Sequence, residues 1–468
     1  MSAPPYDKSS LQPSGIALRP TRRVRLVALT FLIGCALVLW GIVVWNRDTK
    51  AAALLAAVGK NDVPMAMRLL AEGADPNMRE PYASLTDRLS ALFRLTESRE
   101  RETVFCQRTA LMLLIAPSYA YQVSPTHLPS LPLFRALLDH HADPNAPVND
   151  TLPLEACAGN IPDPAYCALL LAHGAKVEGT DSDGMTALMA ACYAQNVPVA
   201  RFLIAQRASV TVTDNAGRTP LHWAAKFSTS GPHSNLAAIP GELLRRGADI
   251  NAQDDEGETP LMRAIENNQL ETITALLANH ADTNLVNSHG DTPLSLAVQS
   301  AQNDAERRRY CMLLLTHGAN IDGVVPHCRT ALMNACQMHD APMVRFLLAH
   351  GASVTASDNA GCTPLHWAMS GDTNSLPHFA AIYAELLARG ADINARDHDG
   401  ETPLMYAVNY NLPNMVKILL AHHADADLID KQGETALSIA LKNAQSGTNM
   451  QPILTLLKRR TRKPAAAP

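Results

Sequence analysis

The stretch Gly217–Ala225, which reads GRTPLHWAA, decides the fold of this chain of 468 residues, because variants of it recur along the sequence. Residues 361–369 repeat it almost letter for letter as GCTPLHWAM. A second signature follows about two dozen residues later, for example LLRRGADIN ending at Asn251. Weaker copies of the first signature begin at residues 257, 290, 400 and 433. Two signatures that alternate in this way identify a repeat protein.

Each repeat unit is predicted to be a turn followed by a helix, a second turn and a second helix. Gly217 permits the positive φ of a tight turn, Thr219 is placed to cap a helix, and Pro220 suits the first helical position. Leu221 and the alanines that follow it at helical spacing form one buried face. In the second signature, Gly247 is expected to end the second helix. A unit this short cannot bury its own apolar face, so the units must stack.

The two signatures closely resemble those of the ankyrin repeat family, whose unit carries G-x-T-P-L-H-x-A-A and G-A-D-x-N. The resemblance extends over nearly all of residues 50–460. It implies an all-α fold, an ankyrin-repeat solenoid of stacked helix-turn-helix units with projecting β-hairpin loops, of the kind that binds other proteins. It also implies that His222 and His366, at the T-P-L-H position, hydrogen-bond the turn backbone between neighbouring units.

The spacing of the signatures agrees with a period of about 33 residues and shows a larger duplication. Leu188 and Leu221, at equivalent positions of two first signatures, lie 33 residues apart. The step from Leu221 to Leu365 is 144 residues, and so is the step from Leu188 to Leu332. A block of four repeats is therefore duplicated in tandem, within an array predicted to hold about eleven repeats.

The chain is predicted to have a short N-terminal segment, a membrane anchor, the repeat domain and a tail. Residues 1–25 are rich in Pro, Ser and Arg and are expected to be disordered. Residues 26–45 are predicted to form a transmembrane helix, and residues 48–460 the repeat domain. Residues 81–102 carry leucines at helical spacing, which predicts an inserted amphipathic helix lying on the end of the array, with a partner-binding helix as the alternative. Residues 461–468 are expected to be a disordered tail.

The segment 26–45, LVALTFLIGCALVLWGIVVW, has 20 residues without a charge, which is enough to span a membrane as a helix. The arginines of residues 22–25 precede it, so the positive-inside rule favours a single-pass membrane protein with a cytoplasmic N-terminus. The repeats are then expected on the exported side, periplasmic or extracellular. Residues 32–35 resemble a bacterial lipoprotein box, and we expect a bacterial source. Lipidation of Cys35, a cleaved signal peptide and the reversed orientation are the alternatives.

Several classes of function are excluded by the sequence. The net charge is −5, so the chain lacks the overall positive charge that is typical of nucleic-acid-binding proteins. Motifs of phosphate loops, zinc peptidases, serine hydrolases and dinucleotide binding are missing, so we expect no enzyme and no cofactor. The pairs His140-His141 and His422-His423 have no further ligands at metal spacing, so we expect no metal site.

The cysteines show no metal-ligand spacing, and their count of nine is odd. Cys157, Cys192 and Cys336 stand at small positions of first helices and are expected to be packed core thiols. Cys157 and Cys167 lie in one helix pair and could meet, although the geometry of packed helices often forbids a disulfide. If the repeats are exported, some cysteines are expected to oxidise.

The resemblance places the partner-binding positions on the hairpins and just after the paired alanines of each first helix. Acidic groups near Glu256 and Asp399 predict a protein partner with a basic patch. Trp223 and Trp367 are expected to be wedged between units. The predicted partner-binding residues are Asn215, Arg218, Lys226, Asp255, Glu256, Glu258, Glu266, Asn359, His398, Asp399, Glu401 and Tyr410.

The sequence thus predicts a membrane-anchored scaffold that binds another protein and performs no catalysis. Two alternatives stay open at this stage. The chain could be a regulatory or protective factor for an envelope enzyme, or a secreted or lipid-anchored effector.

Overall fold

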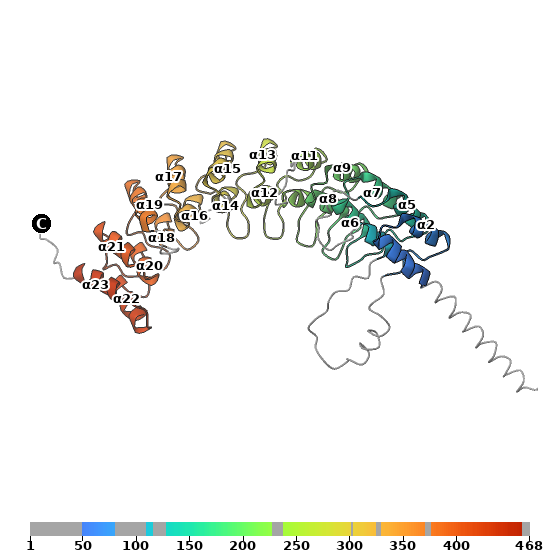
Figure 1. The fold of residues 1–468 in the computed structure, drawn as a ribbon. Coiled ribbons are helices and arrows are strands. Elements are labelled where there is room, and N and C mark those ends of the chain that lie inside the picture. The colour runs from blue at the N-terminus through green and yellow to red at the C-terminus, as the bar shows by residue number, and fades with distance from the viewer. Residues whose placement is uncertain are drawn as a thin grey trace, which may run out of the picture. The chain divides into compact units, whose positions relative to one another are not determined.

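The computed structural model describes residues 49–79, 109–115, 128–226, 237–300, 303–323, 329–369 and 376–460. The chain divides into two compact units. Unit 1 comprises Met1–Leu114 with Pro129–Asp143, and unit 2 comprises Ile115–Leu128 with Pro144–Pro468. Helix labels follow Figure 1, in which the colour runs along the chain.

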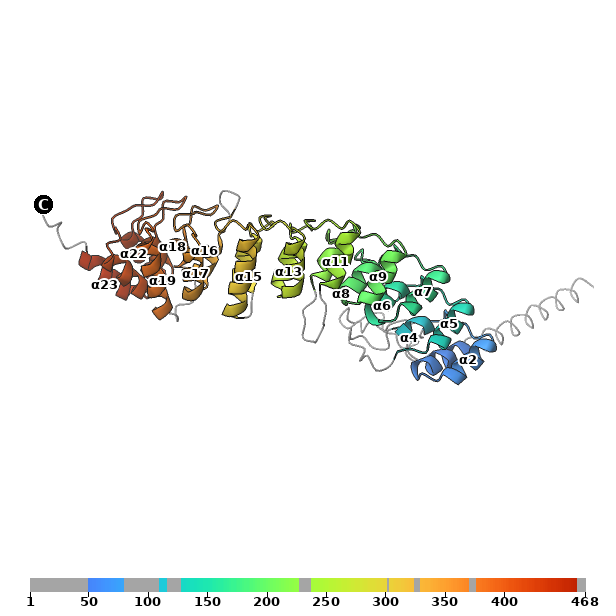
Figure 2. The same cartoon turned by 90° about the horizontal axis from the view of Figure 1, so that it is seen from above.

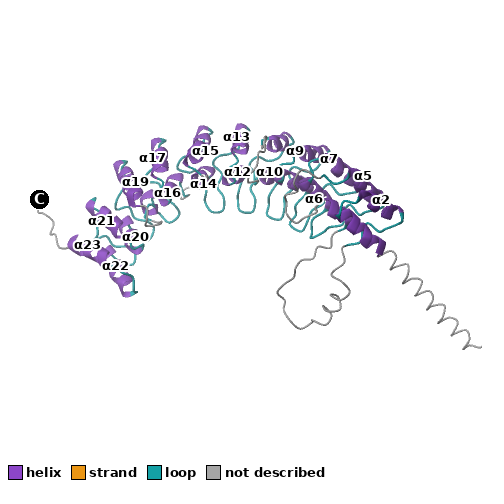
Figure 3. Ribbon diagram, in the orientation of Figure 1, coloured by secondary structure: helices purple, strands orange, loops and turns teal. Residues whose placement is uncertain are grey.

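The regular structure of the described residues is helical. Figure 3 shows helices joined by loops, and the bridges between extended residues in this part of the chain are isolated pairs such as Thr180 with Thr186. The prediction of an all-α array of stacked helix pairs is therefore confirmed. The hairpin loops, where the structure describes them, are tight turns and not extended ladders.

Unit 1 contains a helical segment at residues 49–59 and the helices α2 (Val63–Ala71), α4 (Ala110–Ile115, whose last residue belongs to unit 2) and α5 (Leu131–Asp139). The carboxylate of Asp62 caps α2 by accepting from the Met65 amide at 3.2 Å, and α2 packs against α5. Asn77 links two turns of the unit. Its Nδ2 donates to the His141 carbonyl at 2.7 Å, and its Oδ1 accepts from the Asp143 amide at 2.6 Å.

Unit 2 consists of an inner and an outer layer of helices (Figures 1 and 2). The inner helices are α6 (Pro153–Asn160), α8 (Ala187–Tyr193), α10 (Pro220–Ala224), α12 (Pro260–Glu266), α14 (Pro293–Ser300), α16 (Ala331–Gln337), α18 (Pro364–Trp367), α20 (Pro403–Asn409) and α22 (Ala436–Gln445). The outer helices are α7 (Pro164–Ala172), α9 (Val197–Ala205), α11 (Ala238–Arg245), α13 (Leu270–Ala278), α15 (Asp304–Thr316), α17 (Ala341–Ala349), α19 (Leu376–Ala388), α21 (Pro413–Ala421) and α23 (Gln451–Arg460). Each inner helix packs against the next inner helix, and most outer helices do the same. Within unit 2 the hairpin loops project on the side of the inner helices (Figure 1).

Threonine caps begin most inner helices, as the sequence predicts. Thr259 Oγ1 accepts a hydrogen bond from the Met262 amide at 3.2 Å, and Pro260 occupies the first helical position. The same cap occurs at Thr186, Thr330, Thr402 and Thr435. Gly247 follows α11 with φ +87°, the left-handed conformation expected of a residue that ends a helix.

Small side chains line the contact between helices of unit 2. The position five residues after the capping residue is an alanine with no exposed surface in eight inner helices: Ala191, Ala224, Ala264, Ala297, Ala335, Ala368, Ala407 and Ala440. An alanine lets a neighbouring helix approach closely, and the leucines around it fill the remaining space. These helices are short, and their stability comes from stacking.

Several predictions concern residues outside the described ranges: the disordered segment 1–25, the transmembrane helix 26–45, the inserted helix 81–102 and the tail 461–468. Among the helices that the structure describes, none is both long enough and apolar enough to cross a membrane. The membrane helix, the limits of the repeat domain at 48–460 and the number of repeats stay predictions.

Candidate functional site

A tight hairpin precedes most inner helices of unit 2, and its first residue organises it. In the hairpin 214–218, Oδ1 of Asp214 accepts from the amides of Ala216 and Arg218, both at 2.9 Å. The Gly217 amide donates to the Asp214 carbonyl at 3.0 Å, and Gly217 has φ +75°, which favours glycine. The same Oδ1 contacts recur at 181–185, 254–258, 287–291, 358–362, 397–401 and 430–434, which together with 214–218 form what we name the hairpin row.

Backbone hydrogen bonds join one hairpin to the next. The bonds are Asn215 to Asp183 at 2.9 Å, Asp255 to Ala216 at 3.0 Å, Ser288 to Glu256 at 2.9 Å, His398 to Ala360 at 2.8 Å and Lys431 to Asp399 at 2.8 Å, each from an amide to a carbonyl. A Cβ atom on Gly217 would lie 3.0 Å from the amide nitrogen of Asp255 and 3.2 Å from Cα of Asp254, so a larger residue would crowd the backbone of the next hairpin. The backbone of the hairpin row is therefore held in place before any partner binds, which lowers the entropy cost of binding.

A side chain of the inner helix also holds the hairpin aspartate. The second carboxylate oxygen accepts from the residue nine positions later: Trp223 to Asp214 at 3.0 Å, Arg263 to Asp254 at 2.8 Å, Trp367 to Asp358 at 2.7 Å and Tyr406 to Asp397 at 2.9 Å. These aspartates are buried, so they shape the hairpins and do not face solvent. Trp223 is 7% exposed, as expected of a side chain wedged into the array, whereas Trp367 is only half-buried.

Two predicted site residues meet on the ring of Trp223. The guanidinium carbon of Arg218 lies 4.4 Å from the ring centroid and Nζ of Lys226 lies 4.5 Å from it. Arg218 also pairs with Asp214 at 2.9 Å. Burial and the positive charges of Arg218 and Arg263 lower the pKa of Lys226. Both cations thus pack on an aromatic face, and each is half-buried.

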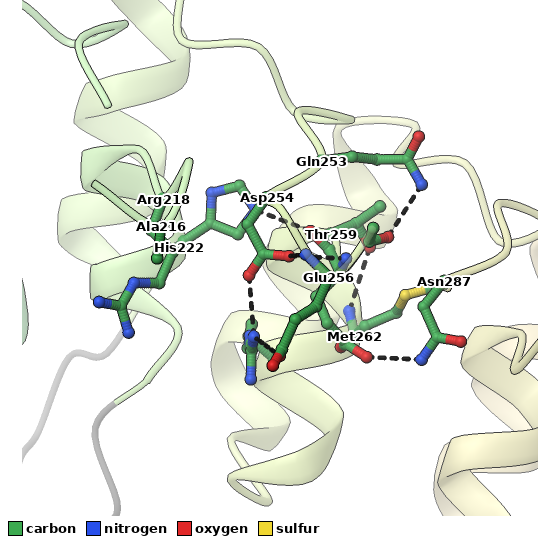
Figure 4. A network of polar contacts seen from close by, with 12 residues as sticks. Ala216, Arg218, His222, Gln253, Asp254, Glu256, Thr259, Met262 and Asn287 are labelled. Atoms are coloured by element: carbon green, nitrogen blue, oxygen red, sulfur yellow. Dashed lines mark hydrogen bonds and ion pairs between the residues drawn. The ribbon is translucent and has the colours of Figure 1, made fainter. Parts of the chain in front are cut away.

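Three acids lie around the guanidinium of Arg263 on α12, and Figure 4 labels two of them, Asp254 and Glu256. Its guanidinium lies 2.8 Å from Asp254, 2.9 Å from Glu256 and 3.4 Å from Glu266. Glu256 and Glu266 are exposed, and Asp255 at the hairpin tip is exposed beside them. The predicted acidic surface of this repeat therefore exists, with one arginine neutralising part of its charge.

Glu258 corrects one expectation, because its side chain is buried and not exposed. It is 3% exposed, and its Oε1 accepts from Nδ2 of Asn287 in the next hairpin at 2.6 Å. Burial raises the pKa of this carboxyl. The neighbouring unit covers the position, so Glu258 joins two hairpins and presents no charge to a partner.

The histidines of the T-P-L-H position bond as the family resemblance implies. Nδ1 of His222 lies 3.1 Å from the Thr219 amide, and its Nε2 lies 2.9 Å from the carbonyl of Glu258 in the next unit. His366 repeats this arrangement, with Nε2 3.3 Å from the carbonyl of Glu401. Burial lowers the pKa of both rings, so they remain neutral at pH 7 and join adjacent units.

In the second copy of the duplicated block, the predicted residues are spread along the surface. Asn359, His398 and Asp399 are exposed at hairpin tips, as Asn215 is in the first copy. Glu401 is half-buried and accepts from Nδ2 of Asn409 at 3.0 Å. Tyr410, the last of the predicted residues, follows α20 and is 52% exposed.

Two exposed side chains next to this surface were not among the predicted residues. Tyr193 ends α8 and is 36% exposed, and Met338 follows α16 and is 43% exposed. Tyr193 lies seven residues after the capping Thr186, the spacing that separates Lys226 from Thr219. A search of every repeat for the residue seven positions after the capping threonine would have identified Tyr193 from the sequence.

The structure also tests the predictions about buried cysteines and about metal binding within the described ranges. Cys157, Cys192 and Cys336 have no exposed surface, which confirms that they are packed core thiols. Within the described residues, no three side chains of His, Cys, Asp or Glu are grouped so that they could hold a metal ion.

Family models match most of unit 2. A model described as ankyrin repeats in three copies matches residues 154–237, 235–323 and 305–382, and one described as ankyrin repeats in many copies matches residues 386–440. These stretches contain the hairpin row and the helices α7 to α18, α20 and α21.

Three known proteins show how far the similarity extends. The palmitoyltransferase AKR1 of Lachancea kluyveri is 30% identical over 200 residues, 42% of this chain and 22% of that protein. The B-cell lymphoma 3 protein homolog of Mus musculus is 30% identical over 192 residues, 40% of this chain and 41% of that protein. Inversin of Mus musculus is 35% identical over 119 residues, 24% of this chain and 11% of that protein. The aligned part is thus less than half of each relative. Because the family models match residues 154–382 and 386–440, more than half of the chain, this chain belongs to the ankyrin repeat family.

Proposed function

We propose that this chain is a scaffold that binds another protein through the hairpin row and the adjoining ends of the inner helices, without catalysis of its own. One observation carries the proposal. The hairpin tips expose their side chains while their backbone amides are bonded to the neighbouring hairpin. Such a surface combines a fixed backbone with side chains that packing does not use, which suits recognition of a partner.

The charge of the tips indicates the kind of partner. Among the two tip positions of each described hairpin, four carry carboxylates and one carries a lysine: Asp183, Asp255, Glu256, Asp399 and Lys431. Most of the hairpin aspartates below them are buried and already paired. The exposed excess is therefore acidic, and a partner with a basic segment would be complementary to it.

The test removes three tip carboxylates with Asp255→Ala, Glu256→Ala and Asp399→Ala in the full-length chain. Each change should alter the free energy of unfolding by less than about 0.5 kcal/mol, because none of these side chains is buried. The matched control removes three carboxylates from outer helices with Glu271→Ala, Asp304→Ala and Glu306→Ala. We expect the partner that copurifies with the unaltered chain to be retained by the control and lost from the hairpin variant. Retention by both variants would contradict the proposal.

We also propose that residues 26–45 anchor the chain in a membrane, with the N-terminus in the cytoplasm and the repeats on the exported side. The uncharged length of the segment and the arginines before it support this placement. Extraction of membranes with alkaline carbonate should leave the full-length chain in the membrane fraction and release a chain that lacks residues 26–45. Recovery of the full-length chain in the soluble fraction would contradict the anchor.

A further inference from the structure

Two thiols of unit 2 touch each other in the contact between α6 and α7. Sγ of Cys157 on α6 lies 3.4 Å from Sγ of Cys167 on α7. Both side chains have no exposed surface, and the two helices belong to one repeat unit and pack together. The distance expected between the sulfur atoms of a disulfide is about 2.05 Å, so the gap to close is about 1.4 Å.

The equivalent positions in other units show that packing does not require these thiols. Cys157 stands five residues after the capping position of α6, where the other inner helices of unit 2 carry alanine. Cys167 stands four residues after the capping residue of α7, where α9, α17 and α21 carry Ala200, Val344 and Val416. All of these residues are as buried as the two cysteines. Alanine and valine suffice for the core, yet this unit holds two sulfur atoms face to face.

The duplicated block supplies an internal comparison. Cys311 on α15 lies 144 residues after Cys167 and is equally buried, but the inner helix of its unit carries Ala297 at the position of Cys157. Within the described residues, the facing pair of thiols therefore occurs in the unit of α6 and α7 and not in its duplicate.

We infer that Cys157 and Cys167 form an intramolecular disulfide when the chain folds in the presence of a disulfide oxidant. A thiolate of one cysteine attacks a sulfur of the oxidant, for which glutathione disulfide serves as the probe, and displaces one glutathione thiolate. The second cysteine, as thiolate, then attacks the protein sulfur of this mixed disulfide and displaces the other. The two cysteines lose two protons and two electrons, and two molecules of glutathione carry them away. The reaction proceeds while the chain folds or the helix pair opens, because burial raises the pKa of the Cys157 thiol in the closed pair.

The bond would tie the two helices of one repeat together through a loop of ten residues. Its effect is expected to be local, since each repeat of a solenoid contacts only its neighbours. The cross-link restricts the unfolded chain, so it should raise the midpoint of thermal unfolding of this region by about 2–6 °C. The site is separate from the hairpin row, and the inference does not depend on the proposed partner.

One tryptic peptide tests the bond directly. No lysine or arginine lies between Arg135 and Lys176, so the peptide 136–176 contains both cysteines. The full-length chain is reduced, unfolded in urea and refolded in detergent with glutathione and glutathione disulfide, and free thiols are then alkylated. We expect this peptide to lack both alkyl groups, to weigh two hydrogen atoms less than the reduced form, and to accept two alkyl groups after reduction. The peptide 177–201, which holds Cys192 alone, should be alkylated without reduction.

Matched variants separate this bond from other thiol chemistry. Cys157→Ala and Cys167→Val copy residues of the other units, so both should fold and show the same helix content as the unaltered chain. The unaltered chain should lose its gain in unfolding midpoint when a reductant is added, and neither variant should respond to the reductant. Two alkyl groups on peptide 136–176 after refolding in the oxidant would overturn the inference. So would a response to the reductant that persists in both variants, because it would come from other cysteines.

Discussion

In the turn after each of several outer helices, one residue has a positive φ, which glycine adopts easily and other residues do not. Gly247, Gly318 and Gly351 occupy the left-handed position in their turns, as the sequence signature requires. His280 takes the same position after α13 with φ +63°, although it has a Cβ atom. The fold therefore imposes the turn on a residue that does not favour it.

We predict that His280→Gly stabilises the protein by about 0.5–1 kcal/mol, because glycine adopts a positive φ without the steric cost. His280 is exposed, so its removal sacrifices little packing. Urea denaturation followed by circular dichroism measures the change in the free energy of unfolding. As the control, Gly247→His places a histidine at the equivalent turn position and should destabilise the protein. A loss of stability in His280→Gly would show that the imidazole contributes more than the backbone strain costs.

Glu155 carries a second prediction at this scale. It is buried on α6, and burial together with the nearby charge of Asp181 raises its pKa from about 4.5 to about 8. The folded state then binds a proton that the unfolded state releases, so the folded state is penalised progressively as pH rises from about 4.5 to about 8, and fully above that.

We expect Glu155→Gln to match the unaltered chain in stability near pH 4.5 and to exceed it by about 1–4 kcal/mol at pH 9. The amide keeps an oxygen that can accept from the Leu152 amide, as the carboxyl does at 3.3 Å. Unfolding curves across this pH range give the measurement, and Glu271→Gln on the exposed face of α13 serves as the control. If the stability of Glu155→Gln and that of the unaltered chain depended equally on pH, Glu155 would be ionised in the folded state and the prediction would be wrong.

At the scale of elements, the hairpins depend on each other as much as on their own sequence. The hairpin 214–218 closes through its own Asp214, but its Asn215 amide also donates to the preceding hairpin, and Trp223 of the helix behind it bonds the second carboxylate oxygen. The inner helix α10 has only five residues, fewer than an isolated helix needs for stability. The row is thus a cooperative element, and a change in one hairpin should be felt in the next.

We predict that Gly217→Ala destabilises the protein by about 1–3 kcal/mol and loosens the contact to the next hairpin. The new Cβ would lie 2.8 Å from Oδ1 and 3.0 Å from the amide nitrogen of Asp255. Hydrogen exchange of the Asp255 amide, which donates to Ala216, should become faster. Gly247→Ala is the matched control, because its φ is also positive but no atom lies within 4 Å of the added Cβ. Equal losses of stability in the two variants would mean that only backbone strain, and not the contact between hairpins, is at stake.

At the scale of the whole molecule, the duplicated block keeps its internal contacts and changes its surface. Asp214 with Trp223 and Asp358 with Trp367 form the same hydrogen bond in the two copies. The charged side chains differ, since Arg218 corresponds to the buried Cys362, Asp255 to His398 and Arg263 to Tyr406. The two copies therefore present different charges on the same framework, and they are expected to contribute unequally to binding a basic partner.

The orientation in the membrane is a prediction for the whole chain. A reporter enzyme that is active only outside the cytoplasm, fused after Pro468, should be active in the unaltered protein. Reversing the charge of Arg22, Arg23 and Arg25 should reduce that activity, because these residues favour retention of the N-terminus. A control that reverses charges in the tail after residue 460 should have little effect. Reporter activity confined to the cytoplasm in the unaltered fusion would reverse the proposed orientation.

The sequence by itself determined the repeat, its two helices and its turns, because these depend on interactions within a few residues. Thr259 caps the helix that Pro260 begins, and Gly217 and Gly247 adopt positive φ where the signatures predict turns. Local preferences of this kind are written in consecutive letters and repeat with the unit.

Only the tertiary structure decided which side chains of one unit meet those of the next. Glu258 has the sequence context of an exposed hairpin residue, but Asn287 of the following hairpin covers it. Arg218 and Lys226 both lie over the ring of Trp223, and the sulfur atoms of Cys157 and Cys167 come within 3.4 Å, although spacing alone left that contact open. Such contacts depend on the offset between stacked units and on side-chain rotamers, which no single repeat contains, so burial and proximity emerge only when the repeats pack together.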